Sequence, residues 1–355
     1  MLKVLRANNC LPKFFLASCW SPSLCAVRFP LEFFLILTTL TIPPVYGRTF
    51  TVLNACPFTI WPAMFTDLNA GQAVPNFPTG WQADPLTSVT FDVPDNWKAG
   101  RIWGRRDCDF TLAPAPTCLS GWCNGGLLCD PHTGTGVPPA SVAEWTLQGD
   151  GNRDFYDVSL VDGFNLPMRI TNSAGCPVAD CPVDLGPSCP ASLKGPLDST
   201  GFPVGCKSAC AANLDGNPTN SPNCCSGSFD TAATCPPSGV QFYSFFKGNC
   251  PNAYAYAFDE SSGTALWTCD SGLNADYTLT FCPSTNGTDP TPVSQSTVSS
   301  LPTTASDVSQ SQSTTSATSS TSNDSFRSSS LGAISNYWTG IWTVSLISVL
   351  LFFLS

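Results

Sequence analysis

The sequence GRIWGRRDC, Gly100–Cys108, is followed closely by CLSGWCNGGLLC, Cys118–Cys129. These two stretches belong to a block of sixteen cysteines that runs from Cys56 to Cys282, whereas the full chain has 19. An even number of cysteines permits complete pairing, and a high density of disulfides is typical of secreted proteins. Each native bridge contributes about 2–5 kcal/mol to stability. The sequence therefore predicts an oxidised, secreted domain.

Metal binding is the alternative use of many cysteines. A zinc site would need a CxxC pair with a second ligand pair at finger spacing, which does not occur in this chain, and His132 is its only histidine. A Ser–His–Asp triad would also depend on His132, which lies in the turn-rich stretch DPHTGTGVPP, and the chain has no GxSxG elbow. We therefore expect no metal and no cofactor.

The charge balance bears on the class of partner. The chain has 15 Lys and Arg against 25 Asp and Glu, for a formal net charge of −10. A strongly acidic surface argues against nucleic acid and anionic membrane surfaces as partners. Charge alone does not identify the ligand, because acidity also keeps an extracellular protein soluble.

The N-terminal residues 1–47 have the pattern of a leader with a signal peptide. The stretch FPLEFFLILTTLTIPPVYG, residues 29–47, has an apolar centre and a small residue, Gly47, at the expected cleavage point. Cys10, Cys19 and Cys25 lie upstream of that centre, so we expect them to be absent from the mature protein. The mature domain would then begin at Arg48 and extend over residues 48–283.

Beyond residue 283 the composition changes to Ser and Thr. Residues 284–330 have too few apolar side chains to form a core, so we expect a disordered stalk, with glycosylation sequons at Asn286 and Asn323. Residues 331–355 end in WTGIWTVSLISVLLFFLS with no basic residue after the apolar run. This pattern favours a GPI-anchor signal, and a retained transmembrane helix is the alternative.

Within the domain, most segments favour strands. Six stretches alternate in polarity or are rich in β-branched and aromatic residues: FTVLNA, VTFDV, EWTLQG, FYDVSLVDG, MRITN and YTLTFC. Gly, Pro, Asn and Asp separate them, as expected for a sandwich or flattened barrel. The cysteine-dense stretch Cys189–Cys250 contains the helix candidates KSACAANL, residues 207–214, and VQFYSFFKG, residues 240–248.

The order of the cysteines, the two stretches quoted first, and DFYDVSLVDGFNLPM at Asp154–Met168 together resemble thaumatin-like proteins of the pathogenesis-related thaumatin family. The similarity runs from Arg48 to Pro283, and the C-terminal signal would make this a GPI-anchored member. The resemblance implies a mainly β fold, namely an antiparallel β-sandwich or flattened barrel with a disulfide-rich excursion containing short helices and a small hairpin region.

The resemblance also implies a complete set of disulfides. Independently of the family, the adjacent cysteines Cys224 and Cys225 are expected to take different partners, because a bridge between neighbours is strained. The implied pairs are Cys56–Cys282, Cys108–Cys118, Cys123–Cys129, Cys176–Cys269, Cys181–Cys250, Cys189–Cys206, Cys210–Cys224 and Cys225–Cys235.

An acidic cleft is the functional site that the resemblance implies. Carboxylates that converge on one groove repel each other, so at least one stays protonated while another is charged, as glycoside hydrolysis requires. The resemblance favours Glu144 as the proton donor, with Asp162 or Asp157 activating water, and Glu260 is the alternative to Asp259. The five implied cleft residues are Arg101, Glu144, Asp157, Asp162 and Asp259.

Two observations weigh against a simple interpretation of these aspartates. Surface aspartates in an acidic domain are usually solvated, and Asp157 and Asp162 could merely flank a strand and cap its turn. An offset of five residues also places the two on opposite faces of a regular strand. Either a bulge or a turn at Asp162 and Gly163 must bring them to the same side.

Aromatic side chains near these motifs could stack on sugar rings, although core packing is the default interpretation for any one of them. The function we expect is binding of β-1,3-glucan, with endo-β-1,3-glucanase activity. The alternative is a non-catalytic glucan-binding or antifungal defence protein. We expect a monomer at the outer face of the plasma membrane or in the cell wall. The aromatic candidates are Trp61, Phe65, Trp81, Phe155, Tyr156, Phe164, Tyr254 and Tyr256.

Overall fold

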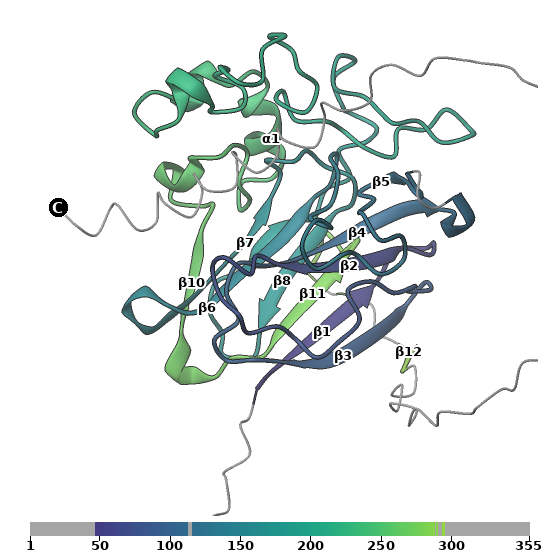
Figure 1. Cartoon of the computed structure of the whole chain (residues 1–355), viewed down its shortest axis with the longest axis vertical. Helices are drawn as coiled ribbons and strands as arrows, with labels where there is room; N and C mark the ends of the chain where they lie inside the picture. Colours follow the sequence, from purple (N-terminus) through teal and green to yellow (C-terminus); the bar gives the residue numbers. More distant parts are fainter. Residues whose placement is uncertain (1–46, 113–115, 288, 290–292, 295–355) are drawn as a thin grey trace, which may run out of the picture. The chain divides into compact units, whose positions relative to one another are not determined.

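The computed structural model describes residues 47–112, 116–287, 289 and 293–294 (Figure 1). The predicted leader, except for Gly47, lies outside the described residues, as do Asn323, most of the predicted stalk and the whole predicted anchor signal. Asn286 is described, and it is exposed in a turn. Within the described ranges, no helix has the length and apolar character needed to cross a membrane.

One six-stranded sheet contains both ends of the domain, because β1 and β11 pair in parallel with Phe50 opposite Tyr277. β1 also pairs antiparallel with β3 on its other side. The sheet order is β12-β3-β1-β11-β8-β9. The strands are β1 (Arg48–Asn54), β3 (Thr87–Val93), β8 (Met168–Asn172), β9 (Ala179–Cys181), β11 (Tyr277–Phe281) and β12 (Val293–Ser294).

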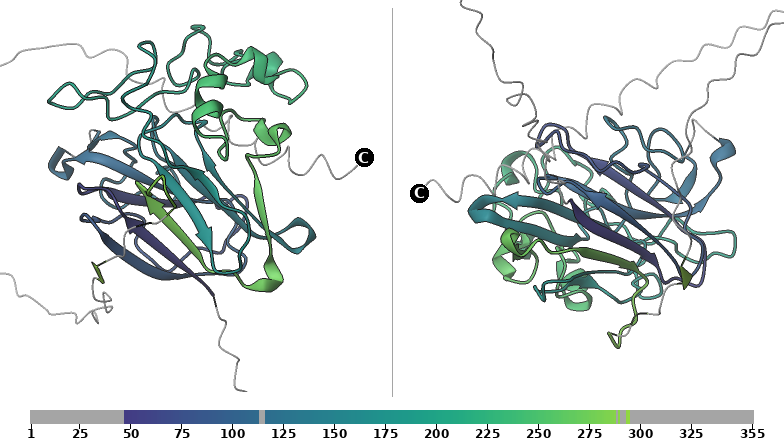
Figure 2. Two further views of the ribbon diagram at one scale, coloured as in Figure 1. Left: turned by 180° about the vertical axis from the view of Figure 1, so that it is seen from behind. Right: turned by 90° about the horizontal axis from the view of Figure 1, so that it is seen from below.

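The second sheet is antiparallel and has the order β10-β7-β6-β4-β2, with β5 paired to β4 beyond this path. Figures 1 and 2 show the two sheets packed face to face. This arrangement confirms the predicted mainly β fold. The strands are β2 (Trp61–Thr66), β4 (Gly100–Cys108), β5 (Cys118–Ser120), β6 (Val142–Gly149), β7 (Arg153–Ser159) and β10 (Trp267–Asp270).

The chain between β9 and β10 forms a loop-rich region beside one end of the sheets (Figure 1). The predicted helix in VQFYSFFKG is confirmed as α1 (Tyr243–Asn249). The helix predicted in KSACAANL is wrong: this segment forms turns, and Asn213 has a φ of 51°, which a regular helix does not allow. The 3₁₀ helices are η1 (Phe110–Leu112), η2 (Asp150–Asn152), η3 (Gly227–Phe229), η4 (Pro237–Gly239), η5 (Asp259–Ser262) and η6 (Ser271–Leu273).

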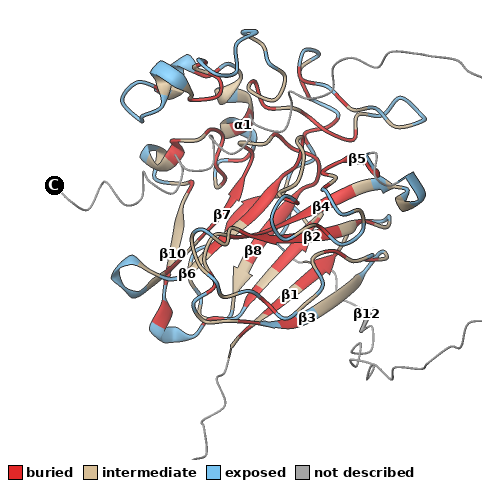
Figure 3. Cartoon of the chain, in the orientation of Figure 1, coloured by how far each residue is buried: buried red, intermediate tan, exposed pale blue. Residues whose placement is uncertain are grey.

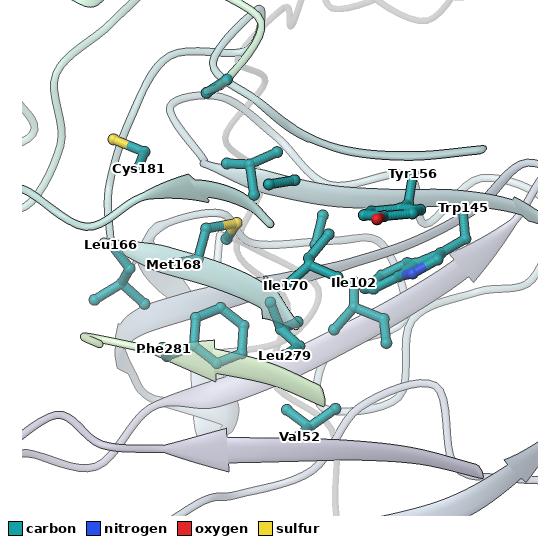
Figure 4. Close-up of a cluster of buried hydrophobic side chains, with 14 of the residues drawn as sticks. Val52, Ile102, Trp145, Tyr156, Leu166, Met168, Ile170, Cys181, Leu279 and Phe281 are labelled. Atoms are coloured by element: carbon teal, nitrogen blue, oxygen red, sulfur yellow. The ribbon is translucent and has the colours of Figure 1, made fainter. Parts of the chain in front are cut away.

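The core lies between the two sheets, and buried residues run along the strands of both (Figure 3). Val52 and Leu279 of the first sheet meet Ile102 and Trp145 of the second (Figure 4). Burial of a large apolar side chain contributes about 1.5–3 kcal/mol. Side chains alternate between the two faces of a strand, so the partly exposed Glu144 lies on the opposite face of β6 from Trp145.

A buried ion pair fixes the start of the domain. Arg48 is only 1% exposed, and its Nη1 atom lies 2.6 Å from the Asp154 carboxylate of the second sheet. Asp154 also accepts a hydrogen bond from the Tyr277 hydroxyl at 3.0 Å, and the Arg48 Nε atom pairs with Asp95 at 3.0 Å. Because these partners come from several strands, the first residue of β1 links the two sheets.

Eight disulfides lie within the described residues, and they join the same pairs that the family resemblance implies. The Cys56–Cys282 bridge spans 226 positions and connects the chain just beyond β1 to the chain just beyond β11. The bridges Cys189–Cys206, Cys210–Cys224 and Cys225–Cys235 close short loops in the region beside the sheets. The first bridge therefore supports the parallel β1–β11 pair, whereas the other three support a region with little regular structure.

We predict that peptide mapping without reduction will recover Cys56 joined to Cys282. Replacement of both residues by serine should lower the free energy of unfolding by roughly 2–5 kcal/mol, because the open chain has more unfolded conformations. Denaturant unfolding of both proteins measures the difference. Recovery of Cys56 as a free thiol, or joined to a nearby cysteine, would contradict this closure of the domain.

Candidate functional site

Three of the implied site residues form a row across adjacent strands of the second sheet. Arg101 on β4 lies directly opposite Glu144 on β6, and Glu144 lies directly opposite Asp157 on β7. Directly opposed residues have Cβ atoms about 4.5–5.5 Å apart and point to the same face. Side chains that are far apart in the sequence therefore meet on the face of the sheet that is turned away from the main core.

Arg101 and Glu144 form an ion pair, with the Nη2 and Oε1 atoms 2.6 Å apart. The Arg101 side chain is 9% exposed, whereas that of Glu144 is 31% exposed. A charge-assisted hydrogen bond of this length is stronger than one between neutral groups. The Arg101 side chain is therefore buried, whereas solvent or a ligand can reach the Glu144 carboxylate.

Asp157 is the most deeply placed carboxyl of the row, with 9% of the residue exposed. Burial raises the pKa of Asp157 well above its usual range, the negative charges of Glu144 and Glu260 raise it further, and Arg101 opposes them. The Oδ1 atom is buried and has no hydrogen-bond partner among the described residues. Since an unpaired buried charge is costly, the neutral form of this carboxyl is favoured.

Asp162 lies in a turn that follows β7. The five-residue offset from Asp157 would place the two aspartates on opposite faces of a regular strand, but the strand ends before Asp162. The Gly163 amide donates to the Leu160 carbonyl at 2.9 Å, and Gly163 has a φ of 89°, which favours glycine. Burial raises the pKa of Asp162 to about 6, opposed by Arg101 and assisted by Glu144. Asp162 also lines a cavity of about 40 Å³ that Phe246 and Tyr256 border.

Asp259, the fifth implied cleft residue, is buried and surrounded by its own partners. This residue is 1% exposed, and its carboxylate is occupied by Lys247 at 3.0 Å, the Tyr243 hydroxyl at 3.0 Å and the Ala255 amide at 2.9 Å. Glu260, the alternative, is the residue whose charge acts on Asp157. The sequence could not separate the two because they are adjacent. We therefore define the acidic cluster as Arg101, Glu144, Asp157, Asp162 and Glu260.

Most of the aromatic candidates for sugar stacking are buried, which agrees with core packing as the default interpretation for any one of them. Only Trp61, Trp81 and Phe155 are partly exposed, and Trp81 packs against the main core. Arg153 covers the Phe155 ring at 5.2 Å. The buried members are Phe65, Tyr156, Phe164, Tyr254 and Tyr256.

Tyr254 takes a place beside the acidic cluster that its sequence did not indicate. Its amide donates to the Val158 carbonyl at 2.9 Å, and its carbonyl accepts from the Leu160 amide at 2.9 Å. Tyr254 therefore pairs in parallel with the end of β7 at Ser159. Burial is the main cause that raises its pKa, and its side chain hydrogen-bonds with Glu260. The sequence marked Tyr254 only as an aromatic candidate for sugar stacking, whereas the residue is 8% exposed.

Among the described residues, no group of three His, Cys, Asp or Glu side chains is placed to hold a metal ion. The carboxyl groups of the cluster can transfer protons and form hydrogen bonds to a polar ligand. An ion-paired carboxylate beside a buried carboxyl with a raised pKa is a combination that suits the acid–base catalysis of glycoside hydrolysis.

The chain is similar to known proteins over the whole β domain. The model of the Thaumatin family matches residues 54–283. The chain is 40% identical over 258 residues to the pathogenesis-related thaumatin-like protein 3.5 of Cryptomeria japonica, covering 70% of this chain and 98% of that protein. It is 37% identical over 254 residues to a glucan endo-1,3-beta-glucosidase of Prunus avium, covering 70% of this chain and 96% of that protein.

Among solved structures, the thaumatin-like xylanase inhibitor TLXI is 21% identical, with a TM-score of 0.33, and the match covers 66% of this chain and 99% of that chain. The family match extends over more than half of this chain and includes every residue of the acidic cluster. The chain belongs to the thaumatin family.

Proposed function

We propose that this protein binds β-1,3-glucan through the acidic cluster and hydrolyses it as an endo-β-1,3-glucanase. The observation that supports this most is the cross-strand row of Arg101, Glu144 and Asp157, in which one carboxylate is ion-paired and its neighbour is buried. The Prunus avium relative, which is named a glucan endo-1,3-beta-glucosidase, supports the same reaction. The cluster also offers several acceptors for sugar hydroxyl groups.

The structure favours a different division of roles from the one implied by the family resemblance. Glu144 was expected to donate the proton, but its carboxylate is paired with Arg101 at 2.6 Å. Burial and neighbouring charges raise the pKa of Asp157, so Asp157 is better suited to carry a proton. In our proposal Asp157 is the general acid, and Glu144 is the carboxylate that assists water or the developing positive charge of the sugar.

A second candidate function is binding of the glucan without hydrolysis, as in an antifungal defence protein. The burial of the Asp157 Oδ1 atom favours this alternative, because a general acid must come within hydrogen-bond reach of the glycosidic oxygen. Hydrolysis therefore requires that the ligand or a small movement bring the oxygen to Asp157, whereas binding through Glu144 requires no such change.

The proposed location is extracellular. Eight disulfides within the domain are typical of proteins that fold in an oxidising compartment. The signal peptide, the stalk and the lipid anchor remain part of the proposal on the basis of the sequence. We propose a monomer carried at the outer face of the plasma membrane or in the cell wall.

We predict that Glu144→Gln and Asp157→Asn will each lower the hydrolysis of linear β-1,3-glucan by about 10²–10⁴-fold, because general acid–base assistance contributes that much to the rate. The assay measures new reducing ends produced by the purified protein, with β-1,4 glucans as control substrates. Asp92→Asn is the matched control variant, since Asp92 is an exposed acid on β3 of the other sheet.

Wild-type rates in both cluster variants would contradict the proposed catalytic roles. If the wild-type protein binds the glucan and releases no reducing ends, the second candidate function holds instead. If the wild-type protein neither binds nor hydrolyses the glucan, both functions are excluded.

We predict that Arg101→Ala will shift the pH profile of hydrolysis toward higher pH. Arg101 lowers the pKa of both Asp157 and Asp162, so its removal raises both pKa values. Asp157 then keeps its proton to a higher pH, while Asp162 loses its proton later. Initial rates measured across the pH range check this, and an unchanged profile or a shift toward lower pH would show that Arg101 does not act on these carboxyls.

A further inference from the structure

We propose that Arg169 binds the start of the C-terminal segment to the outer face of the first sheet, so that the chain leaves the domain on the side opposite to the acidic cluster. The C-terminal segment is defined here as residues 284–287 and Asp289. The match to the Thaumatin family ends at residue 283, so this segment lies beyond the matched domain.

Arg169 lies on β8 and points away from the core. Its neighbours Met168 and Ile170 belong to the buried core between the sheets (Figure 4), and side chains alternate between the two faces of a strand. Arg169 therefore lies on the outer face of the first sheet, between Thr280 of β11 and Asp180 of β9. The residue is nevertheless only 7% exposed, so groups outside the sheet cover its guanidinium.

The matched domain and the C-terminal segment share the hydrogen bonds of this guanidinium. Its Nε atom donates to Asp180 at 3.2 Å, and Asn252 holds the other Asp180 oxygen at 3.0 Å. Its Nη1 atom donates to Asp289 at 3.2 Å, and its Nη2 atom donates to the Ser284 carbonyl at 3.1 Å. The domain thus presents a planar cation whose two outer nitrogens match a carboxylate and a carbonyl of the segment.

Asp289 closes the segment into a turn while it binds Arg169. The same Oδ1 atom that faces the guanidinium also accepts from the Ser284 amide at 3.0 Å. The Gly287 amide donates to the Ser284 carbonyl at 3.2 Å. A short closed loop loses little chain entropy, so two such contacts can hold it. The predicted domain boundary at residue 283 therefore moves to Asp289 in this proposal.

Burial strengthens the ion pair between Arg169 and Asp289. The side chain of Arg169 is 9% exposed and that of Asp289 is 22% exposed. Fully exposed ion pairs contribute little because water and salt screen them, whereas partly buried pairs are screened less. Loss of the Asp289 charge would also leave a buried guanidinium with one fewer charged acceptor, which is costly.

The segment and the acidic cluster lie on opposite outer faces of the sandwich. Arg169 is on the outer face of the first sheet, whereas Glu144 is on the outer face of the second. The next described residues after Asp289 form β12, which pairs with β3 at the edge of the first sheet (Figure 1). If the C-terminal part is attached to a membrane or wall, as the proposed location has it, the acidic cluster faces away from that support.

The test measures amide hydrogen exchange by NMR in the purified protein and in Asp289→Asn. We expect the Ser284 and Gly287 amides to exchange about tenfold faster in the variant, because a neutral acceptor replaces a charged one. Changes in backbone shifts should fall on the segment, β8 and β9, and none at Glu144 or Asp157. Asp92→Asn, an exposed acid on β3 of the same sheet, is the matched control and should leave both exchange rates unchanged.

Arg169→Lys separates the role of the arginine from the local bond between Asp289 and the Ser284 amide. Lysine keeps the charge but cannot donate to Asp180, Asp289 and the Ser284 carbonyl in the planar geometry of arginine. Exchange of the Ser284 amide should therefore become faster although its own acceptor is intact. The double variant should show little further increase, because both changes break the same contact.

Unprotected Ser284 and Gly287 amides in the wild-type protein, or an unchanged rate in Arg169→Lys, would overturn the proposal. Shift changes at Glu144 or Asp157 in Asp289→Asn would show that the segment does not lie on the opposite side. These measurements need no glucan, so failure of the protein to bind glucan overturns the proposed function and leaves the binding of the segment by Arg169 intact.

Discussion

The pairing of β6 with β4 and β7 is the constraint on which both the core and the site depend. On one face of β6, Trp145 packs into the core against Phe50 and Trp97, with ring centroids 5.1 Å and 6.2 Å away. On the other face, the same register sets Glu144 between Arg101 and Asp157. Because a slip of one residue would exchange the two faces, the packing of Trp145 also fixes the carboxylates. The stability of the sandwich and the geometry of the acidic cluster therefore have one common cause.

The acidic cluster opposes folding, and the rest of the domain offsets that cost. Several carboxyl groups come together around a single arginine, and Asp157 is buried without a hydrogen bond to one of its oxygens among the described residues. Burial of an unsatisfied polar group typically costs 1–3 kcal/mol. By contrast, Arg48 and Asp154 form a buried pair whose hydrogen bonds are well satisfied. Disulfides at both ends of the domain and along its loops add stability that does not depend on the charge state of the site.

Much of the fold was predictable because alternation of apolar and polar residues is a local property. The six predicted strand segments correspond to β1, β3, β6, β7, β8 and β11. β2 and β4 were harder to recognise: Pro62 interrupts the first, and glycines and arginines give the second an unusual composition for a strand. The parallel pairing of β1 with β11 depends on contacts between distant parts of the chain, which no local pattern reveals.

Part of the site was predictable from the family resemblance. The resemblance selected Arg101, Glu144, Asp157 and Asp162, and the sheet register with the turn at Gly163 brings them together. The choice between Asp259 and Glu260 depends on the phase of a short helix, which is set by the contact of Asp259 with Lys247. The raised pKa of Asp157 depends on burial and neighbouring charges, and the pairing of Glu144 with Arg101 depends on the sheet register. Neither could be derived from the sequence, so the proposed division of roles rests on three-dimensional contacts.

The central claim is that the outer face of β4, β6 and β7 receives a linear β-1,3-glucan. The most direct measurement is the change in backbone amide NMR shifts when a linear β-1,3-gluco-oligosaccharide is added to the isotope-labelled protein. We expect the largest changes at and around Arg101, Glu144, Asp157 and the turn at Asp162, and none of them with a β-1,4 oligosaccharide. Changes confined to the first sheet, or an unchanged spectrum at saturating ligand, would contradict glucan binding at this face.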